Sequence, residues 1–596
     1  MVYILLCVIA VISLLGGSQA YKELDWWQTS LIYQVYPLSF KDSDGDGYGD
    51  LNGIYQKLDY VKEIGVDVIW IQPFYKSPML DNGYDVADYK SVGPLFGTIE
   101  DFKKLLKGVH DRGMKLIMDF VPNHSSDQCE WFKLSLKGIE PYKDFYVYRD
   151  AKKLNDTHST YPNNWRSIFG GPAWTWREER KQYSFNQFSS KQPDLNYYSP
   201  HLRREMTNVL RYWMDMGVDG FRIDATKHLV EADHFRDEPV LPGVQTVNDY
   251  YTLNHTYTVN QPGSYELVKS WSALLKEYSQ KDGQTRLVAV EDYNKPETLM
   301  RYFGDETHPG AHIPFNFLPL LFFSFKSNST VIEKVIRAWT DVFPEGYYNW
   351  VLENHDNPRM STKFNPESVD MLNAFILLLP GVATIYYGSE LGLEDIKTRP
   401  DQRRDPQNAG GRTGPTVTRD ASRGPMLWDD TTNAGFTTAK KPWLPVNPNY
   451  YRKNVKNQKE NPISHLNVFK RLTKLRKTPV IQHGDFHTFM HGDWVYIFTR
   501  SLETETVAVL MNLGSETEEV CAKNSASTLP DTMFVYTSSI QSGIQEGSKV
   551  STRNVDGTGC PRLRPFSTLV LNTSQGTAAT YSIFAMFLTL FTRYIW

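Results

Sequence analysis

The sequence lacks a marked excess of charge of either sign. Its 596 residues include 64 Lys and Arg against 68 Asp and Glu, for a formal net charge of −4. This balance gives no reason to propose nucleic acid as a partner. Hydrophobic residues make up 41% of the chain and charged residues 22%, which is typical of a folded globular protein and argues against disorder. At this length we expect two or three domains.

Cysteine is scarce, with four residues in the whole chain. Cys7 lies in an apolar leader, which leaves Cys129, Cys521 and Cys560 after the leader is removed. Cys521 and Cys560 could pair within one C-terminal domain, and Cys129 would then remain an odd, buried thiol. This usage agrees with secretion without proving it.

The N-terminus has the pattern of a targeting segment. Val2–Leu15 is almost entirely apolar, and Ser18-Gln19-Ala20 fits a small-x-small cleavage site. The run is short for a membrane span, which needs about 20 residues. It has no Lys or Arg before it, unlike the usual pattern. We predict a cleaved signal peptide over residues 1–20, with an uncleaved anchor as the alternative.

The C-terminus carries a second apolar run, Ile583–Phe591, behind a polar spacer and the small residues around Asn572–Ser574. Small site, spacer and short apolar tail are typical of a GPI-attachment signal, predicted here for residues 572–596. The alternative is an amphipathic or transmembrane tail, because Arg593 lies near the end. The signal predicts a lipid anchor on the outer face of the plasma membrane.

Sequons offer possible N-glycosylation sites at Asn155, Asn254 and Asn328, and a further one begins at Asn572 beside the predicted anchor signal. Asn123-His124-Ser125 also matches but lies in a motif that we expect to be buried. No residue pattern indicates that the displayed protein serves as a receptor for another molecule.

Eight short apolar segments alternate with amphipathic ones. The predicted strands are Leu31–Tyr36, Val66–Gln72, Lys115–Phe120, Gly220–Asp224, Arg286–Glu291, His312–Phe317, Asn349–Glu353 and Ala383–Tyr387. Eight βα units in series predict a (β/α)₈ TIM barrel over residues 21–480. A long segment, 124–192, predicts an inserted subdomain after strand three. Short β runs after residue 480 predict a C-terminal antiparallel β domain, 481–571.

Acidic side chains follow several of these strands. Asp224, Glu291 and Asp356 would meet at the carboxyl-terminal mouth of the barrel, where catalytic groups of this fold gather. Three carboxylates at one mouth suit glycosidic chemistry, which needs a nucleophile and a proton donor. Arg222 shares a strand face with Asp224 and is predicted to lower the pKa of that acid. A purely structural Arg–Asp pair is the alternative.

The motifs together resemble a known family. DFVPNH (119–124), GFRIDATKH (220–228), LVAVEDY (287–293) and ENHDNPR (353–359) are similar to the four ordered signature regions of the α-amylase superfamily of glycoside hydrolases. QPDLN (192–196) resembles a fifth region, found in the α-glucosidase branch and in insect maltases. The resemblance implies a retaining enzyme with Asp224 as nucleophile, Glu291 as general acid/base and Asp356 as transition-state stabiliser.

The resemblance also implies residues that bind the sugar. His124 and His355 match positions that hydrogen-bond glucose hydroxyls, and Arg222 matches the residue that orients the nucleophile. Taken alone, each histidine would read as a satisfied core imidazole. Asp81 and Tyr84 in DNGYD match a pair that binds the terminal sugar. Arg423 in SRGPMLW matches an arginine that joins this aspartate and closes the pocket. Phe188 is predicted to add an aromatic wall.

An acidic loop near the start of the chain predicts a cation site. Asp42, Asp44, Asp46, Tyr48 and Asp50 are spaced two apart, with glycines between them. Gly53 stands where an EF-hand would have Glu, so this is not an EF-hand. The loop resembles the structural calcium site of oligo-1,6-glucosidases, in which the tyrosine supplies its backbone carbonyl. A solvated acidic turn is the alternative.

The position after the nucleophile bears on bond preference. Ala225 is small, which leaves room for an α-1,4-linked aglycone, whereas α-1,6-specific relatives often carry Val. We therefore expect an exo-acting α-glucosidase (maltase) that acts on maltose-like and sucrose-like α-glucosides. An endo-α-amylase, and a non-catalytic, membrane-displayed binding or chaperone protein on a glucosidase scaffold, are the alternatives.

Overall fold

The computed structural model describes residues 23–304, 309–407, 418–554 and 559–574. The predicted signal peptide (1–20) and the anchor signal from residue 575 onward lie outside this part of the chain. Among the described helices, none is both long enough and apolar enough to cross a lipid bilayer.

Eight parallel strands form the central sheet, and all eight predicted strand positions are confirmed. They are β1 (Leu31–Val35), β2 (Val68–Ile71), β5 (Lys115–Phe120), β11 (Gly220–Ile223), β12 (Leu287–Val290), β13 (Ile313–Pro314), β14 (Asn349–Val351) and β15 (Val382–Tyr386). The spatial order is β13-β12-β11-β5-β2-β1-β15-β14. This is the curved, nearly closed sheet of a TIM-like barrel, and the predicted fold class is confirmed.

The barrel is closed by a side chain where the backbone ladder is interrupted between β13 and β14. Strand β13 is shorter than predicted because Pro314 has no N–H to donate. Asn349 replaces the missing bonds: its Oδ1 accepts from Asn316 N at 2.7 Å, and its Nδ2 donates to Pro314 O at 2.8 Å.

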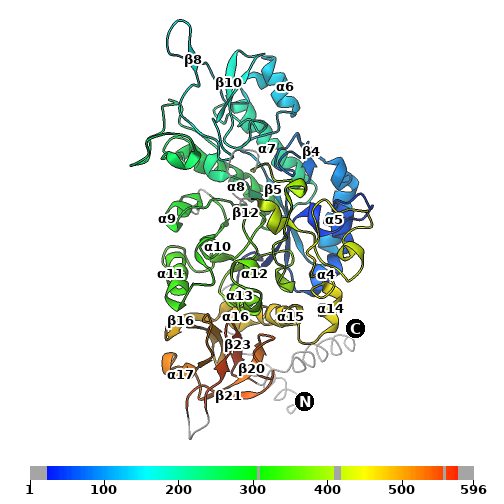
Figure 1. Cartoon of the computed structure of the whole chain (residues 1–596), viewed down its shortest axis with the longest axis vertical. Helices are drawn as coiled ribbons and strands as arrows, with labels where there is room; N and C mark the ends of the chain where they lie inside the picture. The colour runs from blue at the N-terminus through cyan, green and yellow to red at the C-terminus, as the bar shows by residue number, and fades with distance from the viewer. Residues whose placement is uncertain (1–22, 305–308, 408–417, 555–558, 575–596) are drawn as a thin grey trace, which may run out of the picture.

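Helices surround the sheet (Figure 1). In chain order they include α3 (Leu51–Gln56), α4 (Leu58–Glu63), α5 (Ile99–Asp111), α7 (Pro200–Asp215), α8 (Pro262–Asp282), α9 (Pro296–Leu299), α10 (Leu318–Phe322), α11 (Ser329–Thr340), α12 (Met360–Lys363), α13 (Val369–Leu378), α14 (Val455–Glu460) and α15 (His465–Arg476). Helix α7 begins where Ser199 accepts a hydrogen bond from Leu202 N, and Leu202, Met206 and Trp213 lie on its buried face.

Apolar side chains fill the barrel interior. Ile32, Val68, Trp70, Ile117 and Leu287 come from neighbouring strands, and all are almost fully buried. Alternate residues of each strand point inward, so this packed layer supports the polar groups that follow at the strand ends.

A subdomain is inserted between β5 and α7, at the top of Figure 1. It holds α6 (Glu130–Leu136) and the antiparallel strands β6 (Tyr148–Arg149), β9 (Trp174–Arg177) and β10 (Gln182–Phe185). Its own small core stacks Trp165 on Trp174. The two ends of the insertion meet in a bridge between His124 and Asp194, which fixes the subdomain next to the barrel mouth.

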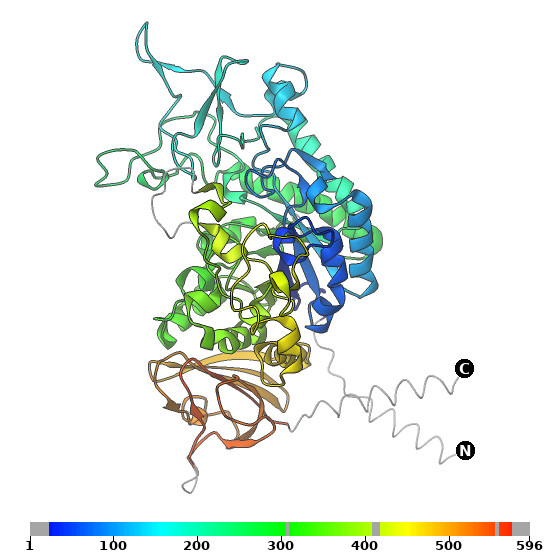
Figure 2. The same ribbon diagram turned by 45° about the vertical axis from the view of Figure 1, so that its right-hand side comes forward.

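The C-terminal domain is an antiparallel sheet at the opposite end of the molecule (Figure 2). Its strands are β16 (Asp485–His491), β17 (Val495–Leu502), β18 (Glu505–Asn512), β20 (Thr532–Ser538), β21 (Lys549–Ser551) and β23 (Thr568–Asn572), in the order β16-β17-β18-β23-β20-β21. Helix α15 holds the domain against the barrel, because Arg471 contacts Glu546 at 2.6 Å and accepts a bond from Tyr536 through its carbonyl.

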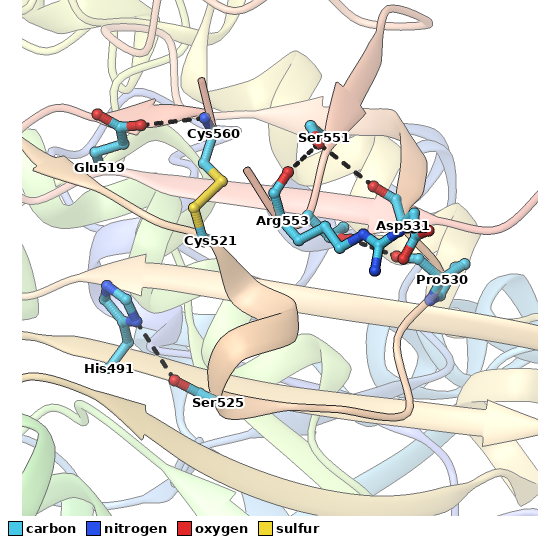
Figure 3. The surroundings of a disulfide bond; sticks show 10 residues. His491, Glu519, Cys521, Ser525, Pro530, Asp531, Ser551, Arg553 and Cys560 are labelled. Atoms are coloured by element: carbon cyan, nitrogen blue, oxygen red, sulfur yellow. Dashed lines mark hydrogen bonds and ion pairs between the residues drawn. A yellow bond between two sulfur atoms is a disulfide. The ribbon is translucent and has the colours of Figure 1, made fainter. Parts of the chain in front are cut away.

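A disulfide bond joins Cys521 and Cys560, the pair suggested by the sequence. Figure 3 shows the bond beside the short helix α17 (Ala522–Ser525). Cys129 is buried and unpaired, as expected.

Candidate active site

A pocket of about 370 Å³ is lined by residues that follow β5, β11, β12 and β14 at the carboxyl ends of these strands. Asp224, Glu291 and Asp356 all face it. The predicted sugar-binding residues in the lining are Asp81, Tyr84, His124, Phe188 and His355, whereas Arg222 and Arg423 lie beneath the surface, 1% and 0% exposed. Asp81 and Arg419, which are 338 positions apart in the chain, therefore meet in one cavity.

Arg222 connects the acids below the pocket. Its Nη1 forms an ion pair with Asp224 and lies 3.2 Å from Asp119 Oδ2, while its Nη2 lies 2.9 Å from Glu291 Oε1. The pairing of β11 with β5 places Asp119 directly opposite Arg222. The guanidinium lies 5.3 Å from the centre of the Trp70 ring, so the apolar layer holds it in place. One buried cation thus fixes two pocket carboxyl groups.

Asp224 and Glu291 are immediate neighbours. Both carboxyl groups contact the guanidinium of Arg222, Asp224 through Nη1 and Glu291 through Nη2, and Ala225 N, directly after Asp224, donates to Glu291 Oε2 at 3.1 Å. An inverting pair lies ~6.5–9.5 Å apart to leave room for a water, whereas two carboxyl groups held by one guanidinium leave little space between them. The arrangement suits a mechanism with a covalent intermediate.

The sequence-based expectation for the pKa of Asp224 was wrong. Burial raises the pKa of Asp224 to about 6, although the adjacent Arg222 acts in the opposite direction. The strand pattern indicated the partner but not the depth at which the pair is buried, and desolvation outweighs the ion pair here. Asp224 remains anionic above about pH 6.

Glu291 has the higher pKa of the two acids. Burial raises it, Arg222 opposes the shift, and the negative charges of Asp224 and Asp356 raise it further, to about 7. A carboxyl group that retains its proton near neutral pH beside an ionised one is a matched acid and nucleophile pair.

Asp356 has the opposite environment. Its Oδ1 lies 2.8 Å from Arg423 Nη2 and 3.3 Å from Arg419 Nη1. Burial opposes its charge, but His355 and the two arginines hold the pKa of Asp356 well below its usual range. Asp356 is therefore a permanent anion at the pocket wall.

The arginine that pairs with Asp81 is Arg419 and not Arg423, which corrects the sequence-based assignment. Arg419 Nη2 lies 2.7 Å from Asp81 Oδ1. Both arginines belong to one turn, Arg419–Arg423 (η10), but Arg423 extends into the core, where its Nε donates to His355 O at 2.9 Å. Residue spacing alone does not distinguish the two ends of such a turn.

The QPDLN segment contacts the same corner of the pocket. Gln192 Nε2 lies 3.0 Å from Asp81 Oδ2 and 3.1 Å from His124 Nε2. Phe188 packs against the His124 ring with 5.1 Å between the ring centres and forms the expected aromatic side of the pocket. Burial lowers the pKa of His124 to about 4, so this imidazole is neutral at physiological pH.

Tyr84 and His355 form a stacked pair in the wall. Their ring centres are 5.4 Å apart and the ring planes are 8° from parallel. The Tyr84 hydroxyl donates to Asp119 Oδ2 at 2.8 Å, which links this wall to the Arg222 cluster. The pair presents a flat, rigid surface of the kind that packs against a sugar ring.

In the acidic loop near the start of the chain, the carboxylates of Asp42, Asp44 and Asp50 converge. Asp46, also predicted as a ligand, stays outside this cluster and accepts a hydrogen bond from Tyr48 N. Asp50 ties the loop to helix α3 by accepting from Gly53 N. Convergent carboxylate oxygens are the donor set that Ca²⁺ prefers.

The three predicted glycosylation sites lie near the surface. Asn155 and Asn254 are exposed, and Asn328 is partly exposed. The Oδ1 of Asn328 accepts from Val331 N and caps helix α11.

Sequence reasoning missed several residues that shape the pocket. Arg419 bridges Asp81 and Asp356, and Asp405 contacts Arg419. Tyr293 lines the pocket, stacks on Phe317 and accepts a hydrogen bond from Asn354. For Tyr293 a signal existed, since it stands two positions after Glu291. For Asp405 we find none, because the loop after β15 has no regular pattern.

The fold and pocket are those of a glycoside hydrolase, and the family is shown directly. The model of the α-amylase catalytic domain matches residues 34–484, so the chain belongs to the α-amylase family, glycoside hydrolase family 13. It is 41% identical to a salivary alpha-glucosidase of Anopheles gambiae, over 93% of this chain and 94% of that protein. It is also 36% identical to an amino acid transporter heavy chain of Homo sapiens, over 93% and 79% of the two chains.

Solved structures give the same result. The crystal structure of an alpha-glucosyl transfer enzyme covers 93% of this chain and 100% of its own, with 30% identity and a TM-score of 0.79. The trehalulose synthase of Pseudomonas mesoacidophila shares 31% identity over 93% and 100% of the two chains, with a TM-score of 0.78.

Proposed function

We propose that the protein is a retaining, exo-acting α-glucosidase that releases glucose from the non-reducing end of α-1,4-linked oligosaccharides. The proposal rests on one observation: the guanidinium of Arg222 holds both Asp224 and Glu291 in a pocket that Asp356 also lines. The relatives' names as alpha-glucosidases and maltases support the substrate class.

In the first step, a carboxylate oxygen of Asp224 attacks the anomeric carbon and forms a β-glucosyl ester. Glu291 donates its proton to the departing glycosidic oxygen, so the aglycone leaves as a neutral alcohol. The pKa of Glu291, raised to about 7, keeps this proton available, and the anion of Asp356 stabilises the positive charge that develops on the sugar.

In the second step, the Glu291 carboxylate takes a proton from water as the water oxygen attacks the same carbon. The ester bond to Asp224 breaks, and glucose leaves with the α configuration of the substrate. The N–H groups of Ala225 and of Arg222 Nη2 contact the two oxygens of Glu291 and hold its carboxyl group in position for both proton transfers.

Exo action follows because one end of the pocket is closed. The ion pair between Asp81 and Arg419 closes it beyond the terminal sugar, with Gln192 bonded to the other oxygen of Asp81. A chain that continued past this point would have to displace a buried ion pair, which is costly. Only a non-reducing end fits, and one glucose is released at a time.

We also propose that the acidic loop binds a structural Ca²⁺ through Asp42, Asp44 and Asp50, with the carbonyl of Tyr48. The fit is good because three carboxylates converge and because burial, together with their mutual repulsion, raises the pKa of Asp44. The ion would contribute stability at a distance from the reaction.

For location, we propose entry to the secretory pathway and attachment to the outer face of the plasma membrane by a GPI anchor. The disulfide of Cys521 with Cys560 supports secretion. A phosphatidylinositol-specific phospholipase should release the protein from membranes; retention after complete digestion of a control protein would contradict the anchor.

The similarity to a transporter heavy chain favours one second candidate, a non-catalytic surface protein. The neighbouring Asp224 and Glu291, with their high pKa values in an accessible pocket, argue against it, because a non-catalytic scaffold has no need of an acid and nucleophile pair. An endo-α-amylase is disfavoured by the Asp81–Arg419 closure.

Hydrolysis of maltose, isomaltose and starch by the wild type and by Asp224→Asn tests the proposal. We expect glucose from maltose, little attack on starch, and a loss of about 10⁴-fold or more in kcat for the variant, as for other removed nucleophiles. A wild type inert on all three sugars in the presence of calcium would favour the non-catalytic candidate. Release of maltooligosaccharides from starch would favour the endo-amylase.

A further inference from the structure

We propose that Asp405 is a positioning residue that aims Arg419 at both Asp81 and Asp356. Asp405 lies in the loop after β15, away from every sequence motif recognised above. The inference rests on the proposed α-glucosidase function and adds a residue that controls recognition of the terminal sugar without touching it.

Three bonds join Asp405 to Arg419. Asp405 Oδ1 accepts from Arg419 Nη2 at 2.8 Å and from Nε at 3.1 Å, and its Oδ2 accepts from Arg419 N at 2.6 Å. The same carboxylate therefore fixes both the backbone and the guanidinium of Arg419. An arginine side chain has many rotamers, so contacts at both its backbone and its guanidinium restrict Arg419 to one position.

The guanidinium held in this way still reaches two pocket acids. Nη2 lies 2.7 Å from Asp81 Oδ1, and Nη1 lies 3.3 Å from Asp356 Oδ1. Each Nη nitrogen has one pocket partner; Nη2 also contacts Asp405, and Nε contacts Asp405. A rotation of the Arg419 side chain would break both pocket contacts together.

The two chain segments are also joined independently of Arg419. Asp420 Oδ2 accepts from Arg404 N at 2.8 Å and from Asp405 N at 3.2 Å. These bonds fix the Asp405 backbone relative to the turn that carries Arg419. The geometry is therefore set before any sugar binds, which is the arrangement that lowers the cost of recognition.

The charge and burial of Asp405 match this role. Its side chain is 0% exposed, whereas that of Arg419 is 12% exposed and lines the pocket. Burial opposes the charge of Asp405, but Arg419 holds the pKa of Asp405 below its usual value. Because Asp405 is fully buried behind Arg419, it does not compete with the substrate for the exposed part of the Arg419 side chain.

A double-mutant cycle tests the proposal, with kcat and KM on maltose measured for the wild type, Asp405→Asn, Arg419→Ala and the double variant. Asp405→Asn should lower kcat/KM by about 100-fold, the usual cost of misplacing a binding group by ~1 Å. In the Arg419→Ala background the same change should cost less than about 3-fold, because the two residues act as one unit. Asp405→Glu should recover part of the loss.

Asp401→Asn is the matched control. Asp401 lies four residues before Asp405 in the same loop, but it is 67% exposed and pairs with Arg399 on the surface. Its kcat/KM should stay within about 2-fold of the wild type, as for other surface changes. Thermal unfolding shows which variants are folded; if Asp405→Asn is not, Asp405→Glu takes its place in the cycle.

Equal losses from Asp405→Asn in both backgrounds would mean that Asp405 acts only on stability, and the proposal would be wrong. The proposal would also be wrong if Asp405→Asn had the same kcat and KM as the wild type. The cycle is repeated with the Kd of 1-deoxynojirimycin, a glucose-shaped inhibitor, which needs no turnover. If the wild type does not hydrolyse the sugars but still binds this inhibitor, the proposed function is wrong. The role of Asp405 can still be tested, because the cycle can be measured from the Kd values.

Discussion

Two groups of aspartates, one at the pocket and one in the loop of residues 42–50, differ in how their negative charge is balanced. Asp81, Asp356 and Asp405 surround Arg419, which contacts all three. The loop carboxylates of Asp42 and Asp50 instead accept hydrogen bonds from backbone N–H groups, at Gly47 and Gly53 for example. Among the described residues, no ion pair reaches the carboxylates of Asp42, Asp44 or Asp50.

The difference indicates what each group is built to receive. In the pocket each of these acids already contacts a permanent protein cation, so the site is suited to a neutral sugar held by directed hydrogen bonds. In the loop, N–H dipoles orient the oxygens but supply no net charge, so the group still attracts a cation. Under the proposed functions, acidic clusters of similar composition would bind different ligands, and the presence or absence of a nearby arginine would distinguish them.

We expect the largest effects from removing the two pocket arginines one at a time. Arg419→Ala should lower kcat/KM about 100-fold, mainly through a higher KM, because Asp81 loses its partner at the sugar-binding wall. Arg423→Ala should mainly lower the melting temperature, because a fully buried partner of Asp356 is lost, at a cost of about 3–5 kcal/mol. Steady-state kinetics and thermal unfolding separate the two; the reverse pattern would restore Arg423 as the closing arginine.

The pH dependence of kcat/KM examines the pocket acids directly. Asp224 must be ionised, and its pKa is raised to about 6, so the rate should fall about tenfold per unit below that pH. Glu291 must be protonated, and its pKa is raised to about 7, so the rate should fall above that pH. The expected profile is a narrow bell between the two values, which belong to the pair as a whole. A flat profile from pH 4 to 6 would contradict the burial of Asp224.

Removal of calcium tests the loop of residues 42–50, and we expect it to have the smallest effect. Chelation should lower the melting temperature by a few degrees, since a ligand at 100 times its Kd adds about 2.7 kcal/mol. Asp44→Asn should abolish this response. Asp46→Asn, an equally exposed change in the same loop but outside the converging cluster, should retain it. Identical behaviour of the two variants would mean that the loop holds no ion at these carboxylates.

The barrel and the three acids were predictable because their signals are local. Each strand is a short apolar run, and Asp224, Glu291 and Asp356 stand at or just beyond the ends of such runs. The position of Asp81 relative to Arg419 was not predictable, because it depends on how a long irregular loop folds back over the mouth. The pKa of Asp224 was misjudged for a related reason: the partner is visible in the sequence, whereas the loss of water around it depends on the whole fold.

Ala225 has a backbone φ of 48° in the left-handed region, directly after the proposed nucleophile. A β-branched residue is strongly disfavoured there, so exchanging Ala225 for Val would do more than narrow the space for the aglycone. It would also disturb the amide that holds Glu291, and any gain in linkage selectivity would come with a slower proton transfer. Under the proposed mechanism, a substitution that changes bond preference at this position should therefore also change turnover.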